Sequence, residues 1–269
     1  MRMENGELRI ISYFCTNMIS KARIKQIHGL EKKKIRQEEG LFVAEGPKLV
    51  GELLSTMKLR YLAATEVWVQ NNPSLSSRVT DIITEDELRR ASLQQHPQEV
   101  IALFEIPHYE PQLAEVACHE LTLALDGVQD PGNLGTIVRL ADWFGIRHIF
   151  CSPDCADIFN PKTIQATMGA IARVQVHYIN LVAELKSLPP EETPIYGTFL
   201  NGQSIYTEEL SNHGIIIMGN EGRGISPEVS ALVSERLLIP SYPAERTTVE
   251  SLNVAIATAI ICAEFRRRA

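Results

Sequence analysis

The sequence predicts an α/β protein made of two parts, a small mixed unit followed by a larger unit with a mostly parallel sheet. Two observations lead to this prediction. From residue 121 onward, short apolar runs alternate with segments of helical periodicity, the pattern of a parallel sheet covered by helices. Residues 107–120 contain two prolines and little periodicity, so they predict a linker between a unit over 18–106 and a unit over 121–269.

Length and composition agree with this fold class. A chain of 269 residues with 45% hydrophobic and 22% charged residues is typical of a water-soluble globular protein with one or two domains. Residues 1–17 lack the basic-then-apolar order of a signal peptide, so we expect an N-terminal extension, or a true start at Met18. No run of 18 apolar residues predicts a membrane span.

The five cysteines are odd in number and scattered, as expected of reduced thiols in the cytoplasm. Cys151 and Cys155 are four residues apart, but no second Cys or His pair is spaced to complete a zinc site with them. The sequence therefore predicts a cytoplasmic protein without a bound metal.

In the first unit, turn and cap residues separate three helices from three strands. Pro47 suits the first turn of a helix, and Thr84 with Glu87 has the spacing of a capping box. The expected elements are helices over 19–40, 47–55 and 84–92, and strands over 41–46, 61–69 and 100–106.

The first unit also begins with a basic segment. The net charge of −7 argues weakly against nucleic acid as a partner, but phosphate binding depends on local charge. Only Glu31 opposes the basic side chains of this segment, which makes RNA binding one interpretation and a solvated basic helix face the other. The basic residues are Lys21, Arg23, Lys25, Lys32, Lys33, Lys34 and Arg36.

The second unit repeats strand and helix in turn, without an internal repeat or a low-complexity tract. Parallel strands joined by crossover helices give this order. The expected strands cover 121–126, 147–152, 173–179, 194–200, 214–219 and 236–240, and the expected helices cover 133–145, 160–172, 180–188, 226–235 and 250–268.

Residues 125–145 are the first of three segments that point to a site. The strand ends at Asp126, and Asn133 is expected to cap the helix that follows. Arg139 lies on the helix face away from the core, near the carboxyl end of a parallel strand, where open α/β sheets bind ligands. The alternative is a surface ion pair between Arg139 and Asp142.

The second segment is Gly219 to Ser226, which places three glycines directly after a buried strand. Its spacing matches neither the dinucleotide fingerprint nor a phosphate-binding loop. We expect exposed backbone amides that a ligand approaches closely, with Glu221 anchoring the loop or contacting a substrate. The alternative is a glycine-rich turn before a helix capped by Ser226.

The third segment, 239–260, leads into a helix that is apolar nearly all round. Such a helix is buried on every side, and near the end of the chain this favours a partner subunit. Ser251 and Asn253 stand at its start, where they either cap the helix or hold a ligand.

Taken together, these segments resemble the SpoU/TrmH family of RNA ribose 2′-O-methyltransferases in the SPOUT superfamily. Residues 42–50 resemble the family's RNA substrate-binding domain, which is related to ribosomal and kink-turn RNA-binding proteins. The resemblance in the second unit covers about 150 residues and rests on three ordered motifs. They are Asn133-x-Gly135-x-x-x-Arg139, Met218 to Gly222 with Gly224, and Ile239-Pro240 with Glu250 to Val254.

The resemblance implies a trefoil knot, a homodimer joined through the C-terminal unit, and a site for S-adenosylmethionine. On the matching positions, the cofactor would contact Thr198, Gly219, Ile239 and Leu252. The substrate implied is a structured RNA, with ribosomal RNA favoured over tRNA. The catalytic residues implied are Arg139, Asn133, Glu221, Ser251 and Asn253, with Arg139 placed to serve the partner's cofactor.

One departure from the family and two alternative functions accompany this resemblance. Residues 241–249 are longer than the family's short link, and Tyr242, Glu245 and Arg246 are expected to reshape or cover the site. A non-catalytic RNA-binding assembly factor would keep the same fold. A nucleotide-dependent oxidoreductase is disfavoured because the dinucleotide fingerprint is absent.

Overall fold

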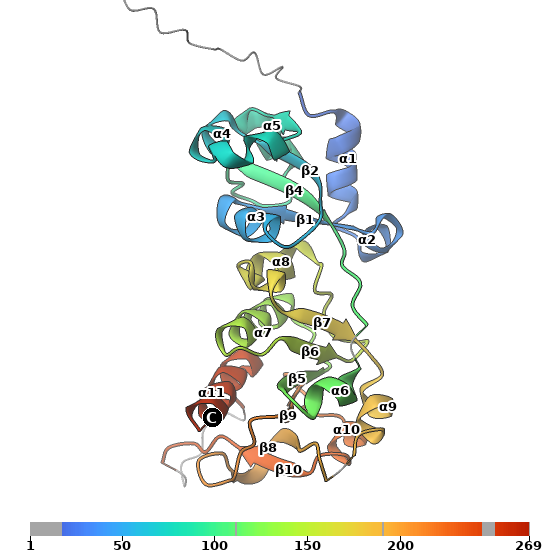
Figure 1. Cartoon of the computed structure of the whole chain (residues 1–269), viewed down its shortest axis with the longest axis vertical. Helices are drawn as coiled ribbons and strands as arrows, with labels where there is room; N and C mark the ends of the chain where they lie inside the picture. The colour runs from blue at the N-terminus through green and yellow to red at the C-terminus, as the bar shows by residue number, and fades with distance from the viewer. Residues whose placement is uncertain (1–17, 111, 190, 244–250, 269) are drawn as a thin grey trace, which may run out of the picture.

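The computed structural model describes residues 18–110, 112–189, 191–243 and 251–268. Two α/β units lie one above the other along the long axis of the molecule, with α8 (Pro161–Thr167) of the second unit next to the first (Figure 1). The two sheets have four and six strands, so the expected α/β class is confirmed.

The first unit is a mixed sheet between two helical layers. Its strand order is β1-β4-β2-β3, with only the β2–β3 pair parallel. The strands are β1 (Leu41–Glu45), β2 (Leu59–Ala64), β3 (Asp81–Ile82) and β4 (Val100–Glu105). The helices are α1 (Lys21–Gly29), α2 (Lys33–Glu39), α3 (Pro47–Leu54), α4 (Glu66–Asn71), the 3₁₀ helix η1 (Pro73–Arg78) and α5 (Glu85–Ala91).

Alternate residues of β1 enter two different cores, as the pleat requires. Phe42 packs with α3 and α4, whereas Val43 packs with α1 and α5. The capping box of Thr84 and Glu87 is present, and Pro47 occupies the first turn of α3, as predicted.

Two elements of the first unit differ from the prediction. The expected strand over 61–69 stops at Ala64, because Thr65 turns the chain and accepts a hydrogen bond from the Trp68 amide to start α4. The expected helix over 19–40 breaks after Gly29 into α1 and α2. Arg36 satisfies carbonyls at this break by donating to the Leu30 and Glu31 oxygens at 2.7 and 2.8 Å.

The second unit contains a fully parallel sheet in the order β10-β8-β9-β5-β6-β7. This result confirms the parallel sheet predicted from the alternating pattern. The strands are β5 (Leu121–Asp126), β6 (His148–Cys151), β7 (Gln175–Tyr178), β8 (Ile195–Ser204), β9 (Gly214–Gly219) and β10 (Glu235–Leu238).

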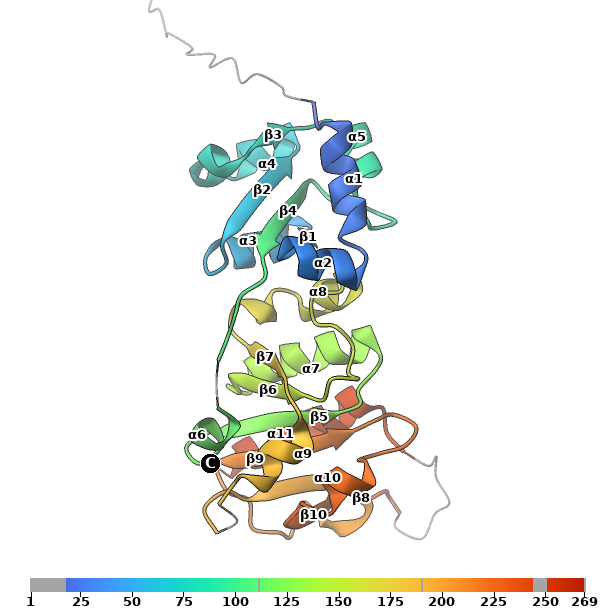
Figure 2. The same cartoon turned by 90° about the vertical axis from the view of Figure 1, so that its right-hand side faces the viewer.

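Helices cover both faces of this sheet (Figures 1 and 2). One face carries α7 (Pro131–Trp143), α8, the 3₁₀ helix η2 (Ala170–Ala172) and α11 (Val254–Arg267). The other carries α6 (Leu113–Ala117), α9 (Leu181–Lys186) and α10 (Pro227–Ser230). Helix α6 lies inside the segment predicted to be an irregular linker, and its buried Leu113 joins the core on this face.

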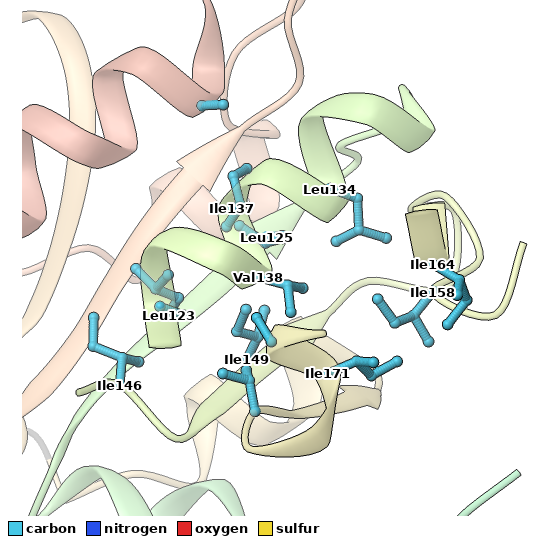
Figure 3. Packing of buried hydrophobic residues seen from close by; sticks show 14 of the residues in the cluster. Leu123, Leu125, Leu134, Ile137, Val138, Ile146, Ile149, Ile158, Ile164 and Ile171 are labelled. Atoms are coloured by element: carbon cyan, nitrogen blue, oxygen red, sulfur yellow. The ribbon is translucent and has the colours of Figure 1, made fainter. Parts of the chain in front are cut away.

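Branched aliphatic side chains fill the space between α7 and the sheet (Figure 3). Leu134, Ile137 and Val138 of α7 are fully buried against Leu123 and Leu125 of β5 and their neighbours. This packing fixes the position of α7 against the sheet. It thereby fixes the positions of the exposed residues on the same helix.

The last helix, α11, leaves one apolar side uncovered within this chain, where Ile256 is 54% exposed. Near its end the buried Glu264 is bonded to Arg267 and Arg268. The three terminal arginines therefore do more than complement the helix dipole, since Arg266 and Arg268 also donate to carbonyls outside the helix.

The two units are joined by a buried ion pair and an aromatic contact. The Arg36 Nη2 atom of the first unit lies 2.5 Å from an Asp157 carboxylate oxygen of the second, and the two side chains are 2% and 15% exposed. The rings of Phe42 and Phe159 pack beside them with centroids 5.1 Å apart. No helix in the described part of the chain is long and apolar enough to span a bilayer.

Substituting Asp157 with Ala should lower the free energy of unfolding by about 3–5 kcal/mol, because the buried guanidinium of Arg36 would lose its counter-charge. Chemical denaturation measures this change. Asp86→Ala is the matched control, since Asp86 pairs with Arg89 at the surface and should contribute under about 1 kcal/mol. Equal effects of the two substitutions would contradict a structural role for the Arg36–Asp157 pair.

Candidate functional site

The candidate site lies at the carboxyl edge of the parallel sheet, where β5 and β9 end side by side. Asp126 and Gly219 are register partners at this edge. The Asp126 carboxylate accepts a hydrogen bond from the Ser226 amide at 2.7 Å, and the Asn220 side chain donates to the Gly127 carbonyl at 2.7 Å. These bonds tie the loop after β9 to the loop after β5.

The loop after β9 folds back on itself. Asn220 and Gly224 exchange two backbone hydrogen bonds of 2.9 Å, and the Asn220 side chain accepts from the amides of Gly222 and Arg223. A Cβ at Gly219 would lie 2.3 Å from backbone atoms of Gly224 and Ile225. The chain's own backbone therefore requires a glycine here, because it occupies the space of a Cβ. The expected approach of a ligand to this loop stays a prediction.

A cavity of about 390 Å³ opens beside this loop. It brings together all four residues expected to contact the cofactor, which come from β8, the end of β9, the segment after β10 and the segment just before α11. These are Thr198, Gly219, Ile239 and Leu252, and the lining also includes Glu221 and Ser251. Apolar walls with a few polar groups are typical of small-molecule sites of this size.

Three polar side chains form a network next to the cavity. Asn133 donates from Nδ2 to Glu221 at 2.9 Å and accepts from Asn253 Nδ2 at 3.0 Å, so α7, the β9 loop and α11 are linked. The expected N-cap role of Asn133 is wrong, because Asp130 caps α7 and accepts from the Asn133 amide. Asn253, not Ser251, caps α11.

Arg139 lies on the exposed side of α7 and does not line the cavity. Within the described ranges it makes no hydrogen bond or ion pair, and Asp142 pairs with Arg173 instead. The alternative interpretation, a surface pair between Arg139 and Asp142, is therefore wrong. Arg139 follows Asn133 by six residues, roughly 9 Å along the helix axis.

The predicted basic residues divide into five exposed lysines, one partly buried arginine and one buried arginine. Lys21, Lys25, Lys32, Lys33 and Lys34 are exposed on α1 or around the start of α2. Arg23 is partly buried, with its guanidinium 4.2 Å from the centre of the Tyr61 ring. Arg36 is a correction, because it is 1% exposed and already bonded to Asp157, so it is not available to a phosphate.

Sequence reasoning missed the residues that hold the loops together. Asn220 was predicted only as part of a family motif. A polar residue directly after a buried strand is also a candidate to anchor the loop that follows, as the Asn220 side chain does here. Tyr242 is 93% exposed, whereas Glu245 and Arg246, also expected to shape the site, lie outside the described residues. Among the residues that the structure describes, no three His, Cys, Asp or Glu side chains gather as metal ligands would.

Comparison with known proteins identifies the family. The model of the SpoU rRNA Methylase family matches residues 120–263. The chain belongs to this family. The model of the MRM3-like substrate binding domain matches residues 21–102 of this SpoU-family chain. A curated relative, the 23S rRNA (guanosine(2553)-2′-O)-methyltransferase RlmP of Bacillus subtilis, is 30% identical over 91% of this chain and 96% of its own length.

Solved structures resemble the SpoU-family chain over nearly its whole length. A candidate RNA methyltransferase of the TrmH family from Porphyromonas gingivalis is 43% identical, with a TM-score of 0.82 over 94% of this chain and all of its own. The AdoMet-bound rRNA methyltransferase of Sinorhizobium meliloti is 28% identical, with a TM-score of 0.78 over 93% of this chain and 96% of its own.

Replacing Gly219 with Ala should destabilise the protein by about 1–3 kcal/mol, because the new methyl group would overlap the backbone of Gly224 and Ile225. Thermal or chemical denaturation measures the change. Gly222→Ala is the matched control in the same loop, since its Cβ would meet nothing closer than 3.7 Å. If the Gly219 variant were as stable as the Gly222 variant, the close approach of Gly219 to the backbone of Gly224 and Ile225 would not matter for stability.

Proposed function

We propose that this chain transfers a methyl group from S-adenosylmethionine to the ribose 2′-hydroxyl of a ribosomal RNA. The observation that carries the proposal is the 390 Å³ cavity, which gathers the four expected cofactor contacts beside the Asn133–Glu221–Asn253 network. Family membership and the rRNA methyltransferase relatives support the reaction, and their names favour ribosomal RNA over tRNA.

The cavity fits S-adenosylmethionine in size and lining. Its volume lies within the range of about 300–1,000 Å³ typical of cofactor sites. Met218, Leu238 and Ala257 offer apolar surface, and the segment from Gly219 to Gly224 offers backbone polar groups. When bound, the cofactor supplies an electrophilic methyl group. Residues of this chain must then orient the ribose and make its hydroxyl a better nucleophile.

Arg139 is the residue that we assign to activation of the hydroxyl. Its guanidinium stays charged, so it acts as a fixed cation that lowers the pKa of a nearby ribose hydroxyl and stabilises the developing alkoxide. A phosphate of the substrate accepts the proton. Glu221 and Asn253, held through Asn133, and Ser251 at the cavity wall orient the ribose.

Arg139→Ala should lower the turnover number at least about 100-fold, because the developing negative charge would lose its fixed cation. Methyl transfer from labelled S-adenosylmethionine to unmethylated 23S rRNA measures turnover. Calorimetry with S-adenosylmethionine tests cofactor binding separately, and its affinity should not change.

The matched control for this experiment is Arg89→Ala, which removes an exposed arginine of the first unit. Turnover of the Arg139 variant equal to that of this control would refute the role of Arg139. Absence of S-adenosylmethionine binding by the unmodified protein would instead refute the proposed function.

We also propose that the protein is a homodimer joined through α7 and α11. These helices pack side by side, and their outer sides carry exposed apolar residues, among them Trp143 at 83% and Ile256 at 54% exposed. Arg139 lies one turn before Trp143 on α7, so a partner on this face would lie against Arg139. This arrangement supports the expectation that Arg139 serves the partner's cofactor.

Ile256→Asp should convert the dimer to a monomer, because a charge would enter the apolar interface. Sedimentation or light scattering measures the mass. Val67→Asp is the control, since Val67 is 53% exposed on α4 of the other unit and should leave the mass unchanged. A mass equal to one chain for the unmodified protein would rule out the dimer.

Family membership further supports a trefoil knot formed by the segments between β8 and α11. We propose that residues 18–106 hold the RNA and residues 121–269 carry out methyl transfer, with 107–120 joining them and 1–17 as an extension. A ribosomal RNA substrate and the free thiols of the described cysteines support a cytoplasmic location.

A further inference from the structure

A second and larger cavity of about 740 Å³ lies between the two units. We call it the interdomain cavity. Its wall in the first unit includes Glu45 and the loop residues Gln94, Gln95 and His96, and its wall in the second unit includes Lys162 and Gln165 of α8. None of the residues assigned above to methyl transfer lines it.

The walls of this cavity are held at a fixed separation. Gln94 donates from Nε2 to the side-chain Oε1 of Gln165 at 2.9 Å, so the two walls are bonded to each other. Helix α8 packs against β1, and the Arg36–Asp157 pair joins the two units. The cavity is therefore part of a rigid junction, and a ligand would find it formed in advance.

The chemistry of the lining favours a nucleobase. The Gln95 side-chain amide offers both a donor and an acceptor, as base edges do, and the Gln94–Gln165 bond leaves the Gln94 Oε1 acceptor and the Gln165 Nε2 donors. Glu45 is 4% exposed, and its oxygens accept from the Ser92 hydroxyl and the Leu93 amide. Burial raises the pKa of this carboxyl group, whereas the two hydrogen bonds act in the opposite direction.

Exposed cations lie on one wall of the cavity and next to the other. Lys162 lines the cavity and is exposed, and on the opposite wall the lining residue Glu31 directly precedes the exposed Lys32. Phosphates contacted by these side chains would remain in solvent, while a base entered the polar interior. Unpaired bases recognised through their edges are the usual basis of sequence-specific RNA binding.

The cavity is also close to the helix that carries Arg139. A Cβ at Gly135 of α7 would lie 2.5 Å from the Ala166 side chain, and Ala166 lines the cavity. Arg139 follows Gly135 by one helical turn, roughly 6 Å along the axis. A nucleotide in the cavity would therefore lie within a few nucleotides of a ribose at Arg139.

We propose that the interdomain cavity binds one unpaired ribonucleotide of the RNA substrate, near the methylated position, with its base beside the glutamine amides and its phosphate at Lys162. This inference rests on the proposed function for the nature of the substrate. Its test measures RNA binding without a methyl donor, so it gives a result whether or not methyl transfer occurs.

Filter binding of an unmethylated 23S rRNA transcript to the full chain tests the proposal. Gln95→Ala should weaken binding about fivefold through the loss of a hydrogen bond to the base. Lys162→Ala should weaken binding and lower the dependence of log affinity on log salt by about one unit, as expected for one phosphate contact.

The matched controls are Gln70→Ala on α4 and Lys186→Ala on α9, both exposed residues far from the cavity. Gln95 and Lys162 are exposed too, so the variants should fold. Affinities within twofold of these controls would overturn the proposal.

Crosslinking gives a second and independent measurement. A 4-thiouridine-substituted transcript, irradiated with the unmodified protein, should crosslink to peptides that contain residues 93–96 or 160–166. Crosslinks that fall only on other peptides would place the RNA elsewhere and overturn the proposal.

Discussion

The close contact between Gly219 and the backbone of Gly224 and Ile225 is the constraint on which the site depends. It allows the loop after β9 to fold back on the end of its own strand, where Asn220 bonds to Gly127. The loop in turn presents Glu221 to Asn133 of α7, and Asn133 to Asn253 at the start of α11. Segments far apart in the sequence thus meet at one edge of the sheet because one residue has no side chain.

Much of the fold follows from local pattern. Strands β5 and β9 are buried on both faces of the sheet, so both are largely apolar runs. Their composition was therefore enough to predict them as strands. The run over 61–69 misled because its branched and aromatic residues suit a strand, whereas the hydroxyl of Thr65 starts a helix in its middle. A single capping hydrogen bond outweighed the propensity of several residues, and propensity alone could not reveal it.

For the candidate site, the sequence predicted which residues meet better than it predicted their interactions. The motif residues of the three segments were expected to meet, and Thr198, Gly219, Ile239 and Leu252 do line one cavity. The N-cap role given to Asn133 was wrong, because Asp130 caps α7. The partners of the Asn133 side chain, Glu221 and Asn253, are distant in sequence and could not be foreseen from it. The same holds for Arg36, which belongs to a basic run in the sequence but meets Asp157 across 121 residues. Only tertiary structure distinguishes such a residue from the exposed lysines around it.

The Arg36–Asp157 contact also bears on how far the first unit is independent. Its counter-charge, and the ring of Phe159 against Phe42, come from the second unit. A fragment ending near residue 106 would expose the Phe42 ring to solvent. The Arg36 guanidinium, which is buried in the full chain, would lose its ion pair and become hydrated. The first unit therefore depends on the second to cover part of its surface, so the two units should unfold together and not as independent modules.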